Sequence, residues 1–155
     1  LFRSKSSLIK FCKDDILFGA MRPYFHKVCI APFEGITRTT CFVLRPKKNF
    51  YFSFAVLTIF RDETINFADS NSKGSTIPYA DWESAMANMK IVIPNDDVLY
   101  RFDEVVRPML SLIRDSYYQN KCLKDTRNYL LPRLLSGEID LSEAKEQVQE
   151  VLNNA

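Results

Sequence analysis

Apolar residues fall in short runs over the first third of the chain, and most runs end at glycine or proline. Between residues 14 and 46 these runs are DILFGAM, KVCIAPFEG and TTCFVLRP. Short runs rich in β-branched and aromatic residues, bounded by turn residues, are typical of β-strands. We therefore expect β-structure over this region, with the polar and aromatic stretch MRPYFHK forming a turn on Pro23.

The next segment, NFYFSFAVLTIF over residues 49–60, is apolar almost throughout. A buried helix fits it best, although its aromatic and β-branched content is also compatible with a strand. A more exposed helix is expected over 61–72, then the loop NSKGSTIP and a last strand at MKIVIP, residues 89–94. Together these elements predict a compact α+β domain over residues 1–95.

Beyond Pro94 the apolar residues recur at alternating steps of three and four, which is typical of a helix that pairs with another helix. A run of ~35 residues at 1.5 Å rise extends roughly 50 Å, too long to be buried along its whole length against the preceding domain. We therefore expect a partner helix along this stripe. The residues of the stripe that are expected to pair are Leu99, Phe102, Val106, Met109, Ile113, Asn120 and Leu123.

Polar residues on the same stripe, Ser116, Asn120 and Arg127, weaken its apolar character. Such residues can fix the register and the choice of a partner helix. In a simple amphipathic helix they would mark only a poorer stripe. Either way, residues 96–155 are predicted to form a helical region distinct from the first domain.

The limits of the helical region also have sequence signals. Asp96 or Asp97 is expected to cap the start of the long helix, and Pro108 is expected to kink or restart it. Asp140 and Glu143 predict a capping box for a short last helix.

Charge is unevenly divided along the chain. Residues 1–61 hold 11 Lys/Arg and 3 Asp/Glu, a balance of +8, whereas residues 62–155 hold 10 and 16, a balance of −6. This division fits a chain in which one part faces a polyanion and the other faces protein, although charges scattered over two solvated faces would give the same count. No apolar run approaches the ~20 residues that span a bilayer. The first residues lack signal-peptide features, so we expect a cytoplasmic chain without membrane contact.

Patterns of catalysis are missing from the sequence, which has no glycine-rich phosphate loop, nucleophile elbow or Asn-Pro-Pro-Tyr motif. His26 is the only histidine, and together with Cys29 it does not complete a tetrahedral zinc site. The cysteines are dispersed and are expected to be reduced. We therefore expect a non-catalytic protein with no cofactor and no metal.

Basic residues meet predicted turns at three places, which makes these turns candidate DNA contacts. Lysine and arginine position a protein on phosphates, and polar side chains read base edges. Each residue taken alone could equally serve a structural turn or the core. The candidates are Arg22, Tyr24, His26, Lys27, Arg38, Thr39, Thr40, Lys73, Ser75 and Thr76.

The stretch LKDTRNYLLPRLLSGEI, residues 123–139, resembles the distal conserved region of type I restriction–modification specificity subunits. That region typically reads Leu-x-x-x-Arg-Asp-x-Leu-Leu-Pro-Lys-Leu-Leu-Ser-Gly-Glu-Ile, with Asp where this chain has Asn128 and Lys where it has Arg133. DILFGAMRPYFHKVCIAPFEG and GSTIPYADW are similar to parts of the target recognition domains of that family, and RFDEVVRPMLSLI to the start of its conserved helix. The resemblance covers residues 14–140 in the same order.

This resemblance implies a non-catalytic subunit whose target recognition domains each read one half of a split DNA sequence. Its helices would space these domains and carry methyltransferase (modification) subunits, and a restriction/translocase subunit would complete the complex. The present chain has one such domain, lacking its beginning, and one long helix. It therefore matches a fragment, a truncated gene product or a half-subunit, and two half-subunits could pair as a homodimer about a two-fold axis.

The leucine-rich block near the end of the helix is the part that the resemblance assigns to a methyltransferase. An alternative is that these leucines cap the core of the helical region itself. A second reading of the whole chain, as a dimeric coiled-coil interaction module without DNA binding, is disfavoured by the basic first half. The candidate docking residues are Arg127, Leu130, Leu131, Leu134 and Leu135.

Overall fold

The computed structural model describes residues 7–139. The chain divides into two compact units, Leu1–Ser111 and Leu112–Ala155. The predicted α+β class is confirmed, because small antiparallel sheets and short helices precede one long helix. The first unit continues past the boundary expected at residue 95, since the beginning of the long helix packs with it.

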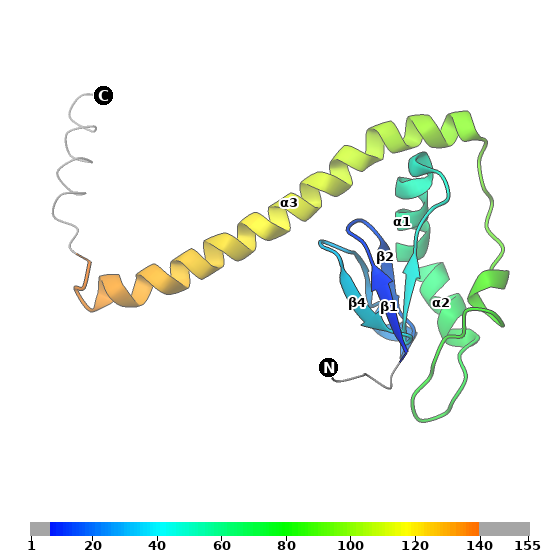
Figure 1. Cartoon of the computed structure of the whole chain (residues 1–155), viewed down its shortest axis with the longest axis horizontal. Helices are drawn as coiled ribbons and strands as arrows, with labels where there is room; N and C mark the ends of the chain where they lie inside the picture. Colours follow the sequence, from blue (N-terminus) through cyan, green and yellow to red (C-terminus); the bar gives the residue numbers. More distant parts are fainter. Residues whose placement is uncertain (1–6, 140–155) are drawn as a thin grey trace. The chain divides into compact units, whose positions relative to one another are not determined.

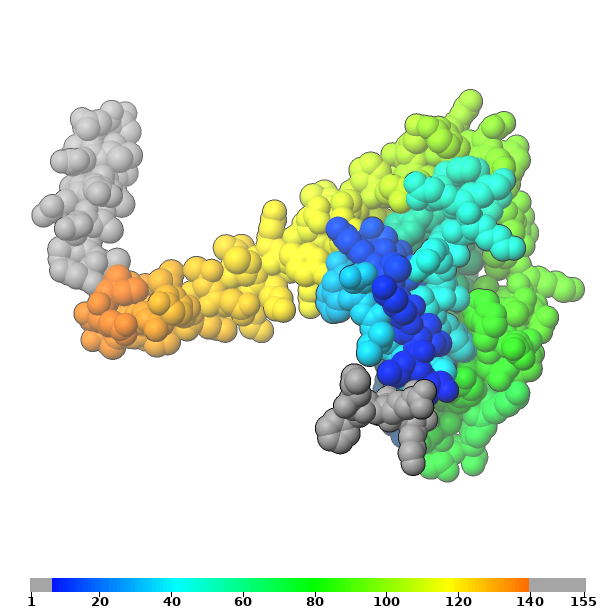
Figure 2. Space-filling view, viewed as in Figure 1, coloured from blue at the N-terminus to red at the C-terminus, as the bar shows by residue number. Residues whose placement is uncertain are grey.

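Within residues 7–139, short strands form two antiparallel sheets in the first unit (Figure 1). In the three-stranded sheet, β2 (Ile16–Gly19) lies between β3 (Val28–Ile30) and β5 (Cys41–Leu44). The second sheet pairs β1 (Leu8–Phe11) with β4 (Gly35–Arg38), and Figure 2 shows β1, in dark blue, at the surface. The β-structure predicted from the short apolar runs is confirmed as β2, β3 and β5, whereas β1 and β4 are further strands. Arg38, predicted to lie in a turn, is the last residue of β4, and only Thr39 and Thr40 form the turn.

The core lies between the three-stranded sheet and two helices, α1 (Phe52–Phe60) and α2 (Asp62–Ser70). Successive residues of a strand face opposite sides of a sheet, so Ile16 and Phe18, two residues apart in β2, share one face. The helices cover this face: Ile16 packs against residues of α1 and Phe18 against residues of α2, and both are almost fully buried. Figure 1 shows the two helices beside this sheet. Burial of such side chains contributes ~1.5–3 kcal/mol each.

The buried helix predicted for residues 49–60 is confirmed, as the 3-10 turn η2 (Asn49–Tyr51) leads directly into α1. The more exposed helix predicted after it is confirmed as α2. The backbone at Arg61 is extended and separates the two helices. Asp62 and Glu63 lie in the first turn of α2, where negative charge favours the helix dipole.

The strand predicted at residues 89–94 is wrong. This segment follows the 3-10 turn η3 (Met86–Asn88) and pairs with no described strand. Its central residue, Val92, is 90% exposed. A β-branched apolar run becomes a strand only where it lies along a sheet edge, whereas this segment borders a hollow with residues of α1 and α2.

The long helix α3 (Asp96–Leu135) is 40 residues long and begins with a cap that differs from the predicted one. The side-chain Oδ1 of Asn95, rather than Asp96 or Asp97, accepts a hydrogen bond from the Val98 N–H at 2.9 Å. Asp96 instead contacts the side chains of Lys48 and Tyr51. Asparagine is among the preferred N-cap residues, because its oxygen satisfies an unpaired N–H of the first turn.

Helix α3 continues through Pro108, so the restart predicted there is wrong, and it also continues through Pro132. It ends where Gly137 adopts φ +75°, a left-handed conformation common just after a helix. The Gly137 N–H donates to the Leu134 carbonyl at 3.3 Å, which satisfies one of the last free carbonyls. The predicted capping box at Asp140 and Glu143, with its short helix, lies outside the described residues.

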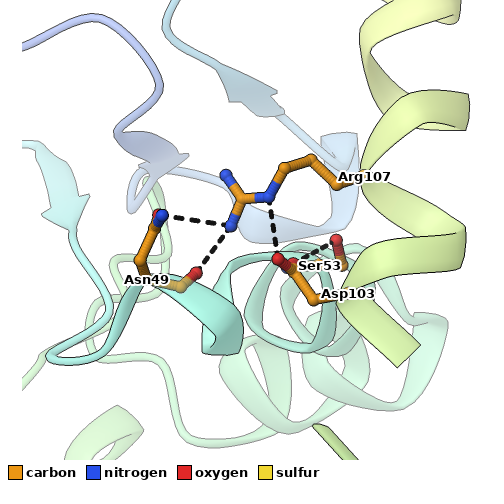
Figure 3. A network of polar contacts seen from close by, with 4 residues as sticks. All are labelled: Asn49, Ser53, Asp103 and Arg107. Atoms are coloured by element: carbon orange, nitrogen blue, oxygen red, sulfur yellow. Dashed lines mark hydrogen bonds and ion pairs between the residues drawn. The ribbon is translucent and has the colours of Figure 1, made fainter. Parts of the chain in front are cut away.

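A buried polar network joins α3 to the start of α1 (Figure 3). Asp103, which is 7% exposed, accepts hydrogen bonds from the Ser53 N–H at 3.0 Å and the Ser53 hydroxyl at 2.6 Å. Arg107 donates to the other carboxylate oxygen at 2.8 Å and to the Asn49 carbonyl at 2.6 Å. No side chain of the α1 N-cap makes a capping bond, so Asp103 supplies the cap from another helix.

The same network fixes the charge of Asp103. Burial alone would raise the pKa of this carboxyl group, but the hydrogen bonds from Arg107 and Ser53 outweigh burial and hold the pKa below its ordinary value. The Arg107 guanidinium also lies 4.6 Å from the centre of the Phe52 ring. The first turns of α3 are therefore attached to the first unit by both polar and aromatic contacts.

None of the helices described in residues 7–139 combines the length and the apolar character that crossing a bilayer requires.

Candidate nucleic-acid interface

The three loops that the sequence marks as DNA contacts meet at one end of the three-stranded sheet. Where β2 ends, the Ala20 N–H donates to the Thr40 carbonyl at 2.9 Å, which joins the turn at Thr39 and Thr40. The Ala20 carbonyl accepts from the Ala80 N–H at 2.9 Å, and the Arg22 N–H donates to the Pro78 carbonyl at 2.7 Å. Main-chain hydrogen bonds thus hold together segments that are widely separated in the sequence.

The turn after β2 contains the 3-10 element η1 (Pro23–Phe25) and has a rigid frame. Its flanking residues, Arg22 and His26, have φ of 49° and 50°, in the left-handed region that is uncommon for residues other than glycine. The His26 N–H donates to the Pro23 carbonyl at 2.8 Å. The Lys27 ammonium donates to the Met21 carbonyl at 2.6 Å, which ties the two ends of the turn together.

His26 faces the helices of its own unit. Its Nδ1 lies 3.5 Å from the Asp62 carboxylate, and its ring centre lies 6.3 Å from that of Phe60. Its Nε2 is buried and has no hydrogen-bond partner among residues 7–139. These contacts make His26 a residue that holds the η1 turn against the start of α2.

The loop that contributes Lys73, Ser75 and Thr76 is closed by its own main chain. Lys73 and Tyr79 exchange two backbone hydrogen bonds of 2.9 Å, and Met21 forms a β-bridge to Tyr79 from the other side. Gly74 has φ +90°, and a Cβ atom there would lie 3.1 Å from the Ile77 carbonyl oxygen. The loop is therefore a tight turn whose exposed tip carries Ser75 and Thr76.

The cationic side chains at this end of the sheet differ in how far their charges are already used by hydrogen bonds or ion pairs within the protein. Within residues 7–139 the guanidinium groups of Arg22 and Arg38 form no hydrogen bond or ion pair, and both side chains are exposed. Lys27 uses one of its three donors on Met21 and keeps the others. Lys73 lies 3.7 Å from the Asp81 carboxylate, which partly compensates its charge. Arg22 and Arg38 are thus the most available cations.

The opposite end of β2 carries a structural ion pair. Asp15, just before the strand, accepts hydrogen bonds from Arg45 at 2.6 and 2.7 Å and from the Cys12 N–H at 2.7 Å. The Arg45 hydrogen bonds hold the pKa of Asp15 below its ordinary value despite its burial. Arg45 therefore serves to fix β2 to β5, and its charge is already matched.

Phe25 was not among the predicted DNA contacts, but in the structure it is one of the exposed residues of the η1 turn. Its position in a polar and aromatic turn made the core an equally reasonable place for it. The buried residue of this turn is Pro23. In the sequence, a proline directly before two aromatic residues in a polar turn is a pattern that could have predicted an exposed turn.

Comparison with known proteins agrees with the resemblance found in the sequence. No protein-family model matches the chain. The type I restriction enzyme MjaIX specificity subunit of Methanocaldococcus jannaschii is 32% identical over 93 residues. This chain is similar to a type I specificity subunit. The aligned part is 60% of the chain and 20% of the relative, so the chain spans about a fifth of the relative's length.

The apolar stripe of α3 is exposed over most of its length, with one exception. Leu99 is 1% exposed and belongs to the core of the first unit, so its assignment to a helix-pairing surface is wrong. Val106 is partly covered in the same unit, and Phe102 and Met109 are exposed. In the second unit the predicted pairing residues Ile113, Asn120 and Leu123 are exposed.

The leucine-rich block of the second unit is helical and presents its leucines to solvent. These are Leu130, Leu131, Leu134 and Leu135. Arg127 donates to the neighbouring Asn128 side chain at 2.9 Å. Arg133 lies 3.7 Å from the centre of the Tyr129 ring and donates to Glu138 at 3.2 Å, so local contacts stabilise the end of the helix. Within the described residues these leucines do not bury one another.

Proposed function

We propose that this chain reads one half of a split DNA target as a non-catalytic part of a type I specificity subunit. One observation carries the proposal: three loops with basic and hydroxyl side chains meet at one end of the three-stranded sheet. Ala20 is hydrogen bonded to two of these loops there. The similarity to a specificity subunit supports DNA as the polyanion. An end of a sheet that carries free cations can follow a phosphate backbone.

The side chains of the loops would make different kinds of contact with DNA. Arg22 and Arg38, whose guanidinium groups have no partner among residues 7–139, can pair with phosphate or bidentately with guanine in the major groove. The hydroxyls of Ser75, Thr76 and Thr39 can donate to and accept from base edges. The main-chain frame would hold these groups in fixed relative positions, which specific readout requires.

Replacing Arg22 with alanine is the direct test. The affinity for duplex DNA should fall, and the slope of log affinity against log salt should become shallower by about 0.9 if the guanidinium contacts one phosphate. Fluorescence anisotropy with a labelled duplex of mixed sequence, at several salt concentrations, measures both quantities. Lys47→Ala is the matched control, because it removes an exposed cation beyond the opposite end of β5.

An unchanged slope in Arg22→Ala would remove this residue from the interface. If the unmodified chain bound no duplex DNA at any salt concentration, the proposal would fail. The alternative, a coiled-coil interaction module without DNA binding, would then be favoured by the exposed stripe of the second unit.

Partner subunits belong to the same proposal. We propose that the exposed leucines near the end of α3 dock a methyltransferase subunit, and that a restriction/translocase subunit completes the assembly. Two observations support this proposal. The leucines are exposed, and they belong to a block that resembles the distal conserved region of specificity subunits. A free surface would not need this concentration of leucine.

We also propose that two copies of the chain pair through the stripe of the second unit. The exposed Ile113 and Leu123 provide the apolar contact, and Asn120 between them would set the register. Sedimentation should give a dimer at micromolar chain concentration. Asn120→Leu should tighten the association, because an apolar residue replaces a polar one on a pairing stripe. A monomer for both proteins would contradict this pairing.

A further inference from the structure

The tip of the η1 turn presents two aromatic rings to solvent. Tyr24 is 48% exposed and Phe25 is 59% exposed, and their ring centres lie 4.7 Å apart. Single exposed apolar side chains are common on protein surfaces and need no explanation. Here two rings adjoin each other between Arg22 and Lys27, at the end of the sheet where the candidate DNA contacts meet.

The turn beneath these rings is held from several sides, so the rings keep a fixed place. Pro23 is buried under the tip, and the Arg22 N–H is bonded to Pro78 of the neighbouring loop. His26 is held by Asp62, on α2. The Lys27 ammonium lies 5.7 Å from the centre of the Phe25 ring. A rigid aromatic tip between cations loses little conformational entropy when it contacts a ligand.

We infer that Phe25, with Tyr24 beside it, stacks on the face of a nucleobase when the first unit binds duplex DNA. This inference rests on the proposed function and assigns a part of the interface that phosphate contacts do not explain. Aromatic side chains stack on any base, and apolar wedges such as phenylalanine enter between base pairs that are partly unstacked. The cations on both sides of the tip would hold the backbone while the ring enters the step.

Stacking at one step gives Phe25 a positioning role with a consequence for the target sequence. Pyrimidine–purine steps such as TA and CA unstack more easily than other steps. A ring that enters a step therefore favours targets with a pyrimidine–purine step at that place, without a hydrogen bond to either base. Arg22 and Lys27 would contribute to binding of every sequence, whereas Phe25 would contribute more where the step opens easily.

The test compares Phe25→Ala with Phe33→Ala in the full chain. Phe33 has nearly the same exposure, 63%, but follows the opposite end of β3 and packs near Phe11, with ring centres 6.2 Å apart. Phe25→Ala should weaken binding to a mixed-sequence duplex by ~5- to 150-fold, the range that corresponds to loss of one stacked base. Phe33→Ala should bind like the unmodified chain, and Phe25→Trp should retain most of the affinity.

The salt dependence separates stacking from a merely structural role. Stacking releases no counterions, so the salt slope of Phe25→Ala should equal that of the unmodified chain. A shallower slope would mean that Phe25 only holds Arg22 and Lys27 in place, and it would overturn the inference. Equal affinity of Phe25→Ala and the unmodified chain would overturn it too, while leaving DNA binding intact. If the unmodified chain bound no duplex, the proposed function and the inference would both fail.

Discussion

Replacing Asp103 with alanine should lower the free energy of unfolding of the first unit by about 3 kcal/mol. The change removes the partner of a partly buried Arg107 hydrogen bond and leaves the buried Ser53 N–H, at the start of α1, without an acceptor. A buried donor that loses its acceptor costs its full desolvation, because water cannot replace the lost bond. Urea denaturation followed by tryptophan fluorescence measures the difference.

Asp96→Ala is the matched control for this experiment. Asp96 also lies on α3 and also contacts the segment before α1, through Lys48 and Tyr51, but it is exposed. Exposed ion pairs contribute little, so the loss of Asp96 should destabilise the first unit much less than the loss of Asp103. Equal destabilisation by the two substitutions would show that burial of the Asp103 network has no special effect.

The effect of Asp103 should also depend on pH. Its pKa is below the ordinary value in the folded state, so the carboxylate stabilises the fold fully above its unfolded pKa of ~3.9. The stabilisation is lost as the pH falls through the lower, folded-state pKa. The difference between the unmodified chain and Asp103→Ala should therefore be largest near neutral pH and should shrink below pH ~4. A difference that stays constant down to pH ~3 would contradict this assignment.

Replacing Leu134 with aspartate should abolish co-purification of the chain with a tagged type I methyltransferase subunit. A carboxylate forced into an apolar interface is desolvated without a partner, at a cost of several kcal/mol, which corresponds to a loss of affinity of roughly a hundredfold or more. In the free chain the side chain of Leu134 is exposed, so the melting temperature should change little. Thermal unfolding and pull-down on the same variant give both readouts.

Leu112→Asp provides the control, since it places the same charge on an exposed leucine of the same helix, outside the docking residues. It should still co-purify with the methyltransferase. If Leu134→Asp instead lowered the melting temperature and disturbed a dimer, the leucines would belong to the core of the helical region. A folded Leu134→Asp chain that still bound the methyltransferase would leave the block with a structural role only.

Local sequence signals predicted the elements that local chemistry determines. Gly19 and Pro46 mark the ends of β2 and β5 as predicted, whereas Gly35 begins β4, and the continuous apolar segment became η2 and α1. The run at residues 89–94 failed as a strand because strand formation depends on a neighbour that the run itself does not specify. Asn95 took the capping position from the two aspartates next to it, a choice within the uncertainty of helix boundaries.

Contacts between distant residues could not be predicted in the same way. The bond between Asp103 and Ser53 joins residues 50 apart. In the sequence, an aspartate next to a glutamate near the start of a helix has the pattern of a solvated charge. The individual loop residues of the interface were identifiable by their chemistry. Their meeting around Ala20 depends on the pairing of β2 with β5 and on the bridge at Tyr79, which only the fold provides.

The frame around Ala20 has a consequence for how such a domain could change over generations. Its connections to Thr40 and Ala80, and that of Arg22 to Pro78, run from main-chain N–H to main-chain carbonyl. Bonds of this kind are indifferent to side-chain identity, apart from proline at a donor position. The exposed residues of the three loops can therefore be exchanged without dismantling the scaffold. Such a scaffold can acquire a new target by a few substitutions and remain folded through every intermediate.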